Sequence, residues 1–387
     1  MAWLGLKTLA FIPLTRSNIP SDVPPPNWAD QIMQRVYYDK DPRTGVDRSL
    51  RAYIHTVSSG LADLHVVVQP PQTIVGTGAG GTNVAPDALE ATQGNLLRAQ
   101  GYDGAAIVML GGPGGGSTGG YWSRFCMSDN HGAWVGEIVH QTNLCNLPDL
   151  FDFTDEFPNE NMGAYDQEAG YGYTHFSVWT KRAIGWLNPS TVPLHVGHSA
   201  NYTLHSASLI QPPPSGRVAA VQIGTRVPYL MVEARHQADQ FDINIPDDGV
   251  IVYQVQTTDP LGNAQNQVPP LNLLTKTGLA AGQSFTIVNG VKVEVDSSVA
   301  GGFSITVTNN GLGIVPDVLN ESEATASEKI NAAGFIPKFN FPHTPAAARG
   351  AAGPVINIWV KSQSPVGGST AALDTVVTLT MAVTIVR

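Results

Sequence analysis

Short runs of alternating apolar and polar residues dominate this chain, and they predict many strands and few helices. Residues 7–14 read as an opening core strand, 61–68 as a second strand and 105–110 as a buried one. Helical spacing of apolar residues is limited to short stretches such as 49–59 and 87–100, the latter with Asp87 as its expected N-cap. The first part of the chain therefore mixes strands with helices.

One of the predicted helices carries His140. The apolar residues Trp134, Ile138 and Val139 have helical spacing, and they predict a helix that begins near Gly132. Asn146 follows shortly after it, and we expect this residue to make the left-handed turn that glycine usually makes at the end of a helix.

After Pro189 the pattern changes to alternating strands, which predicts a β-sandwich. The last segment differs again, because a helix from about 321 to 333 ends at Gly334 and precedes a strand at 376–381. We expect a small unit there, with one helix on a three-stranded sheet. The strands expected in the middle region are 217–223, 229–234, 249–256, 283–288, 291–295 and 303–308.

Composition and charge exclude some classes of protein. The chain has 387 residues with 42% hydrophobic and 13% charged residues, enough to bury at least one full core. Its net charge is −10, and no basic cluster is longer than Lys181-Arg182, which argues against nucleic-acid binding. The longest apolar run, 9–14, is too short for a transmembrane helix.

Two further features, a glycine run and a pair of cysteines, do not point to a specific chemistry. The glycine run at 111–120 lacks the Gly-Lys-Ser/Thr ending of a phosphate-binding loop, so it predicts an ordinary loop. The two cysteines, Cys126 and Cys145, fit either one disulfide bond or two buried thiols. The spacing does not choose between these alternatives.

The segment from Tyr121 to Pro189 resembles the immune inhibitor A type of secreted zinc metallopeptidases, which are metzincin-like. In that family a helix carries His-Glu-x-x-His, in which both histidines bind zinc and the glutamate activates a water molecule. A third, acidic ligand follows a Leu-Pro pair, and a methionine turn lies beneath the metal. The residues that carry the resemblance are His140, Leu147-Pro148-Asp149, Asn161-Met162-Gly163 and Gly185-Trp186.

The resemblance implies that His140 and Asp149 are zinc ligands and that Met162 forms the methionine turn. However, Gln141 stands at the general-base position and Leu144 at the second histidine. The third-ligand position also comes nine residues after His140, where the family has ten. Because glutamine does not accept a proton near neutral pH, the conventional mechanism is lost.

Substitutes for the lost groups are present nearby. Cys145 is a candidate zinc ligand with His140 and Asp149, and Glu137 is a weak candidate for a replacement base. The carboxylates between 149 and 168 form a dense acidic stretch that suits either calcium or a solvated loop. The candidate calcium ligands in it are Asp152, Asp155 and Glu156.

Two later regions also resemble known families. Residues 229–253 resemble the β region that follows the catalytic core of the same peptidases, in which Glu233 and Arg235 are expected to form a structural pair. Residues 313–387 resemble a PASTA domain, a module associated with cell-wall fragments in penicillin-binding proteins and bacterial receptor kinases.

The sequence as a whole therefore predicts an α+β protein. We expect a metzincin-like domain at 1–190, a β-sandwich at 191–312 and a PASTA-like domain at 313–387. The predicted function is a degenerate, non-catalytic relative of the peptidases that binds a protein or peptide or has a structural or assembly role. The alternative is an active secreted zinc endopeptidase with irregular ligands.

The expected location rests on the resemblance, which implies the outside or the surface of a bacterial cell. No signal peptide is visible in the first fourteen residues, because the apolar stretch has no basic start before it, so the cytoplasm stays an alternative.

Overall fold

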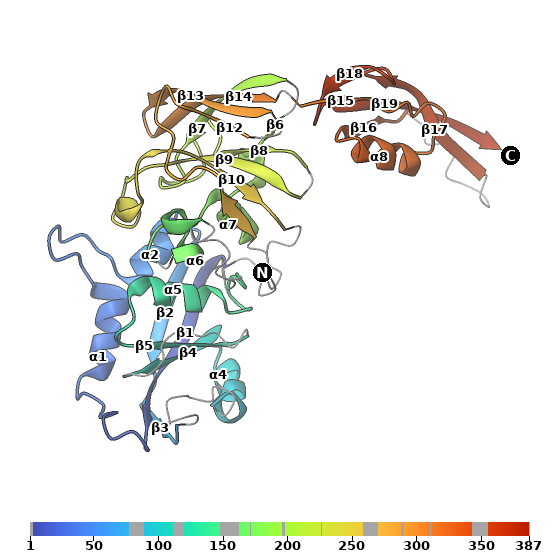
Figure 1. Ribbon diagram of the computed structural model, residues 1–387. Coiled ribbons are helices and arrows are strands. Elements are labelled where there is room, and N and C mark those ends of the chain that lie inside the picture. Colours follow the sequence, from blue (N-terminus) through green and yellow to red (C-terminus); the bar gives the residue numbers. More distant parts are fainter. Residues whose placement is uncertain are drawn as a thin grey trace.

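The computed structural model describes residues 3–76, 89–110, 120–147, 162–170, 172–195, 198–225, 227–257, 270–287, 290–309, 311–342 and 355–386. In these ranges the chain is mixed α and β, with many strands and few helices, as the sequence predicts. Figure 1 shows three groups of elements that follow one another along the chain, with the C-terminal group extending away from the other two. Within the described ranges, no helix has the length and apolar character that a membrane span requires.

The first group is a sheet of five parallel strands in the order β2-β1-β4-β5, with β3 also paired to β1. The helices α1, α2 and α5 cover one face, and α4 covers the other. Burial on both faces explains why β1 and β4 read as continuous apolar runs. The elements are β1 (Gly5–Arg16), α1 (Trp28–Met33), η1 (Gln34–Tyr38), α2 (Leu50–Val57), β2 (Ala62–Val68), β3 (Gln72–Ile74), η3 (Glu90–Gly94), α4 (Asn95–Ala99), β4 (Gly104–Met109), β5 (Trp122–Cys126) and α5 (His131–Val139).

Local sequence accounts for the helix that matters most. The side chain of Asn130 accepts a hydrogen bond from the Ala133 amide and caps α5 at its N-terminus. Every residue of α5 from Gly132 to Val139 is buried except Ala133. The helix predicted from Gly132 is therefore confirmed, and it is enclosed by the protein over most of its length.

The second group consists of two sheets that face each other across one apolar core. One sheet has the order β11-β10-β9-β8-β6 and the other β12-β13-β14-β7. The alternating pattern in this region is thus explained by strands with one face toward the shared core. The strands are β6 (Leu194–His195), β7 (Ser199–His205), β8 (Ala220–Ile223), β9 (Tyr229–Arg235), β10 (Gly249–Val255), β11 (Leu271–Leu273), β12 (Ser284–Thr286), β13 (Val291–Val299) and β14 (Gly302–Asn309).

Short helical elements pack on the opposite face of the sheet that contains β9 and β10. Met162 and Trp179 from this segment share a core with Ile251 and Tyr253 of β10. The segment therefore belongs by its packing to the second group as much as to the first. Its elements are η4 (Gly163–Tyr165), α6 (Gln167–Gly170), α7 (Val178–Ala183) and η5 (Pro189–Thr191), and η6 (Asp242–Asn244) follows β9.

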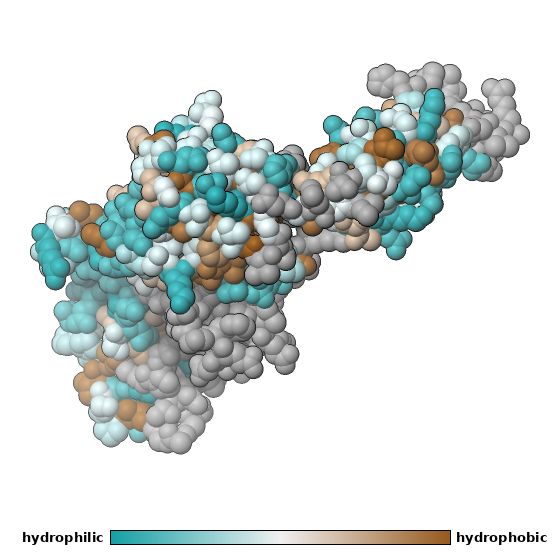
Figure 2. All heavy atoms as spheres, turned by 45° about the horizontal axis from the view of Figure 1, so that its top comes forward, coloured by the Kyte–Doolittle hydropathy of each residue, from teal (hydrophilic) through white to brown (hydrophobic). Residues whose placement is uncertain are grey.

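The third group has the expected arrangement of one helix on a three-stranded sheet, in the order β16-β19-β17, beside a two-stranded sheet of β15 and β18. The side chain of Ser322 caps α8, and Gly334 ends it with a φ of 84°. Figure 2 shows the hydrophobic residues on the visible face as small separate patches among polar ones. The elements are β15 (Leu312–Ile314), α8 (Glu323–Ala332), β16 (Ile336–Asn340), β17 (Val355–Ser364), β18 (Thr370–Ala372) and β19 (Val376–Val386).

Some of the expectations lie outside the described residues. They are the N-cap Asp87, nearly all of the glycine run, and the acidic residues Asp149, Asp152, Asp155 and Glu156. The domain ranges 1–190, 191–312 and 313–387 stay predictions.

Candidate functional site

The chain turns sharply just after α5, as the sequence predicts. Asn146 has a φ of 53°, in the left-handed region, and its amide donates to the Gln141 carbonyl at 3.1 Å. The next amide, that of Leu147, donates to the Val139 carbonyl at 3.1 Å. This turn folds the chain back so that the Leu147 carbonyl faces the ring of His140.

His140 lies between two acceptors. Its Nδ1 is 2.7 Å from the Leu147 carbonyl oxygen, so this nitrogen carries the proton and donates it. Its Nε2 is 3.4 Å from Oε2 of Glu168, a fully buried carboxylate on α6. The histidine that resembles a first zinc ligand thus faces a carboxylate from a segment about thirty residues away, and sequence spacing could not have indicated that pairing.

The side chain of Gln141, at the general-base position of the resemblance, contacts strands β4 and β5. Its side chain is fully buried, and its Nε2 donates to the Ala105 carbonyl at 3.0 Å and to Oγ of Ser123 at 2.7 Å. Its Oε1 lies so close to Gly104 that a β-carbon there would be 2.0 Å away. The amide therefore joins the end of α5 to strands β4 and β5.

The other candidate residues near His140 are also buried in the fold. Glu137 is buried within α5, and its backbone carbonyl accepts a hydrogen bond from the Ser123 hydroxyl. Leu144 and Cys145 are fully buried in the apolar core on the α5 face of the sheet. Burial raises the pKa of the Cys145 thiol far above its usual value, which disfavours the thiolate that a metal needs.

The two cysteines are free thiols, so the disulfide alternative is wrong for this structure. Cys145 belongs to the core on the α5 face of the first sheet, whereas Cys126 belongs to the core on the α4 face. Burial raises the pKa of the Cys126 thiol to about 11. The sheet itself separates the two sulfur atoms.

Met162 is fully buried and precedes η4, where it packs against the second group of elements. Its role as a methionine turn beneath a metal stays a prediction. Among the residues that the structure describes, no three His, Cys, Asp or Glu side chains converge to hold a metal ion. His140 and Glu168 bring two side chains of these types together there, 3.4 Å apart.

A polar pocket of about 350 Å³ lies at the opposite end of α5. Asp39, Arg48, Asn130, His131 and Tyr173 contribute to its lining. Nε2 of His131 is 2.9 Å from Oδ2 of Asp39. Burial, with the nearby cations Arg35 and Arg48, lowers the pKa of His131 to about 4, so the imidazole is neutral at physiological pH. Sequence patterns did not indicate this pocket, because its residues come from three separate segments.

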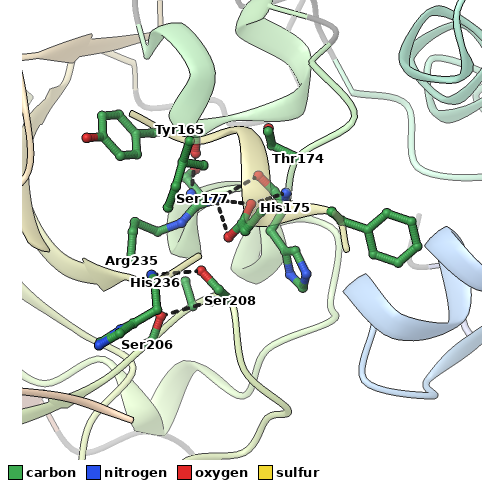
Figure 3. Close-up of polar contacts among 12 residues, drawn as sticks. Tyr165, Thr174, His175, Ser177, Ser206, Ser208, Arg235 and His236 are labelled. Atoms are coloured by element: carbon green, nitrogen blue, oxygen red, sulfur yellow. Dashed lines mark hydrogen bonds and ion pairs between the residues drawn. The ribbon is translucent and has the colours of Figure 1, made fainter. Parts of the chain in front are cut away.

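Buried polar and charged groups form a network between α7 and β9, and Figure 3 shows the part of it around Arg235, His175 and Ser177. Arg235 donates to both oxygens of Asp242, at 2.9 and 2.8 Å, and lies 3.5 Å from Glu233. Glu233 accepts hydrogen bonds from the Val178 amide and the Tyr253 hydroxyl, each at 2.8 Å. The prediction that Glu233 and Arg235 form a structural pair is confirmed, since both are fully buried.

The same network contains a chain of three titratable groups. Asp239 lies 2.7 Å from Nε2 of His175, and Nζ of Lys181 lies 3.0 Å from Nδ1 of the same ring. Lys181 also donates to the Ala207 carbonyl at 2.7 Å. Burial, with repulsion from Arg235, lowers the pKa of Lys181 to about 8. The isolated residue types in the sequence did not indicate this arrangement.

Comparison with known proteins adds no assignment, because no protein-family model matches the chain and a search of curated proteins finds no similar one.

Proposed function

We propose that this chain is a non-catalytic, metzincin-like protein that acts by binding or as a structural component. The observation that carries the proposal is the position of Gln141. Its amide donates to Ala105 and Ser123 within the fold, which leaves it unable to orient or deprotonate a water molecule beside His140. Leu144, where the second histidine would be, is part of the apolar core.

The binding role is assigned to a protein or peptide ligand. The pocket beside the N-terminus of α5 supports this, since it combines the carboxylates Asp39 and Asp41 with the cations Lys40 and Arg48. Such a mixed lining suits the charged and polar groups of a peptide better than an apolar small molecule. A peptide array probed with wild-type protein and with His131→Ala tests this, with Arg43→Gln as a control at an exposed position of the same loop.

The C-terminal unit adds a second proposed contact. Its helix on a three-stranded sheet supports the resemblance to PASTA domains, and we assign to it the binding of cell-wall material. We therefore propose a site of action outside or on the surface of a bacterial cell. Sedimentation of residues 1–387 with purified peptidoglycan tests the assignment.

An active zinc endopeptidase is the second candidate, and one distance favours it. Nε2 of His140 and Oε2 of Glu168 are 3.4 Å apart. Two ligands that each lie about 2.1 Å from one tetrahedral zinc ion are separated by about 3.4 Å. If zinc binds, these two side chains would hold it, and the ion would supply Lewis-acid chemistry.

Metal content and turnover separate the two candidates. Zinc and calcium are measured by elemental mass spectrometry on protein purified without chelators, for the wild type, His140→Ala and Glu168→Gln, and each sample is assayed with casein. The non-catalytic proposal predicts no casein cleavage above that of His140→Ala. Stoichiometric zinc that is lost in both variants together with cleavage would establish the peptidase instead.

A further inference from the structure

A cavity of about 560 Å³ lies beside the C-terminal end of α7, and none of its lining residues belongs to the sites that the proposed function uses. Trp179, Arg182 and Ala183 of α7 line it from one side, and Val227 and Tyr229 line it from the start of β9 and the turn before it. This volume is within the usual range for sites that hold small molecules.

Arg182 is held in a fixed orientation at the wall of this cavity. Its Nη1 donates to Oε1 of Gln222 at 3.1 Å, and its Nη2 donates to the Tyr229 hydroxyl at 3.2 Å. Gln222 is itself fixed, because its Nε2 donates to the Gly224 carbonyl at 2.9 Å. The guanidinium is therefore oriented before any ligand arrives, which reduces the entropy cost of binding.

The guanidinium of Arg182 is hydrogen-bonded to neutral side chains and not to a carboxylate of the described residues. Both of its side-chain hydrogen bonds go to neutral groups, and no ion pair of the described residues includes it. A cation in the last turn of a helix is favoured by the helix dipole. That effect explains the positive charge, but it does not explain two neutral side chains that aim the guanidinium at a cavity.

The rest of the lining fixes the chemistry of a ligand. Trp179, Ala183, Pro189 and Val227 supply apolar surface, and Thr225 and Thr257 add two hydroxyl-bearing side chains. The Tyr229 oxygen accepts from Arg182, so its own O–H remains available as a donor. A guanidinium has five N–H donors, and at least one on each terminal nitrogen is left for a ligand. Donors without carboxylates, next to apolar walls, suit an anion attached to an apolar group.

We propose that this cavity binds a carboxylate attached to an apolar group, with Arg182 and Tyr229 on the carboxylate and Trp179, Ala183 and Val227 around the apolar part. Two sources share this chemistry, a free organic acid and the carboxyl terminus of a peptide whose last side chain is apolar. A charge-assisted pair between guanidinium and carboxylate supplies both orientation and attraction.

The test uses the full chain and four probes in ligand-observed NMR titrations. The probes are 3-phenylpropionate and its primary amide, and an acetylated dipeptide ending in leucine with a free or an amidated carboxyl terminus. We expect a Kd on the order of 1 mM for at least one carboxylate. We expect binding to weaken about tenfold or more for its amide and for Arg182→Gln.

Matched variants make the result specific. Arg43→Gln removes the same charge from an exposed position and should leave the Kd unchanged. Tyr229→Phe keeps the ring and removes the hydroxyl, and it should weaken binding about threefold even if Arg182→Gln folds poorly. Binding of only the organic acid or only the peptide identifies the source. Equal binding of carboxylate and amide, unchanged binding in both site variants, or no binding of any probe would overturn the proposal.

Discussion

The side-chain amide of Gln141 donates to the hydroxyl of Ser123 at 2.7 Å, and the same hydroxyl donates to the backbone carbonyl of Glu137. Ser123 thus links Gln141, which stands at the degenerate general-base position of the resemblance, to Glu137, the weak candidate for a replacement base. Both belong to the contact between α5 and the sheet. The C-terminal end of α5, which stops just before His140, is therefore fixed against β4 and β5 by Gln141 and Ser123.

Replacing Gln141 by glutamate should destabilise the protein without creating activity. A carboxylate at this position loses the two donated hydrogen bonds and faces the Ala105 carbonyl in a buried environment. We expect the free energy of unfolding to fall by about 2–4 kcal/mol in urea titrations. Gln100→Glu, at an exposed position, is the control and should change stability little. A Gln141→Glu protein that is as stable as the wild type and cleaves casein would contradict this account.

Gly104→Ala should also destabilise the protein, because the new β-carbon would lie 2.0 Å from Oε1 of Gln141. We expect a loss of about 1–3 kcal/mol in the free energy of unfolding. Gly120→Ala is the matched control, since a β-carbon there meets nothing within 4 Å. In a Gln141→Ala background most of the Gly104→Ala effect should disappear, which a double-mutant cycle measures. Additive effects of the two substitutions would show that the contact does not matter.

The elements around His140 could be predicted from local sequence, and the partners of its side chains could not. The capped helix α5 and the left-handed Asn146 depend on nearby residues, so their patterns indicated them correctly. The pairing of His140 with Glu168 depends on how two separate segments pack together. No spacing rule within one helix contains that information.

The sequence also could not decide between a disulfide and two thiols, because that depends on how separate segments pack. Sequence separation fixes the loop that a bond would close, but it does not fix which face of the sheet each cysteine occupies. The buried chain of Asp239, His175 and Lys181 was missed for a related reason. Its residues come from a loop after β9, from the segment just before α7 and from α7 itself, and they read in the sequence as ordinary polar positions.

The ion pair of Arg235 and Asp242 should make the free energy of unfolding depend on pH in the acidic range. Burial alone would raise the pKa of Asp242, but the attraction of Arg235 and the hydrogen bonds to its carboxylate outweigh it and lower the pKa to about 2. Between its ordinary value of 3.8 and about 2, the unfolded chain binds more protons than the folded one, so stability falls as pH falls. This group contributes about 2 kcal/mol above pH 4 that is lost toward pH 2.

Asp242→Asn tests this directly. At pH 7 it should lower the free energy of unfolding by about 3–5 kcal/mol, because Arg235 is left buried without its carboxylate. The difference from the wild type should shrink by about 2 kcal/mol as pH falls from 5 to 2 in urea titrations. Asp30→Asn, at an exposed position, provides the comparison and should follow the wild-type curve. A difference that is constant with pH would mean that Asp242 does not titrate as described.

The two thiols should be unreactive in the folded protein and fully reactive after unfolding. Both are completely buried, and burial raises the pKa of Cys126 to about 11, so the thiolate that attacks a disulfide reagent is scarce at pH 8. Labelling with a chromogenic disulfide reagent should therefore detect almost no thiol in buffer and two per chain in 6 M guanidinium without reductant. Cys126→Ser and Cys145→Ser should each lower the denatured count to one. A denatured wild type that shows no thiol until it is reduced would establish the disulfide and require the two sulfur atoms to lie on the same face of the sheet.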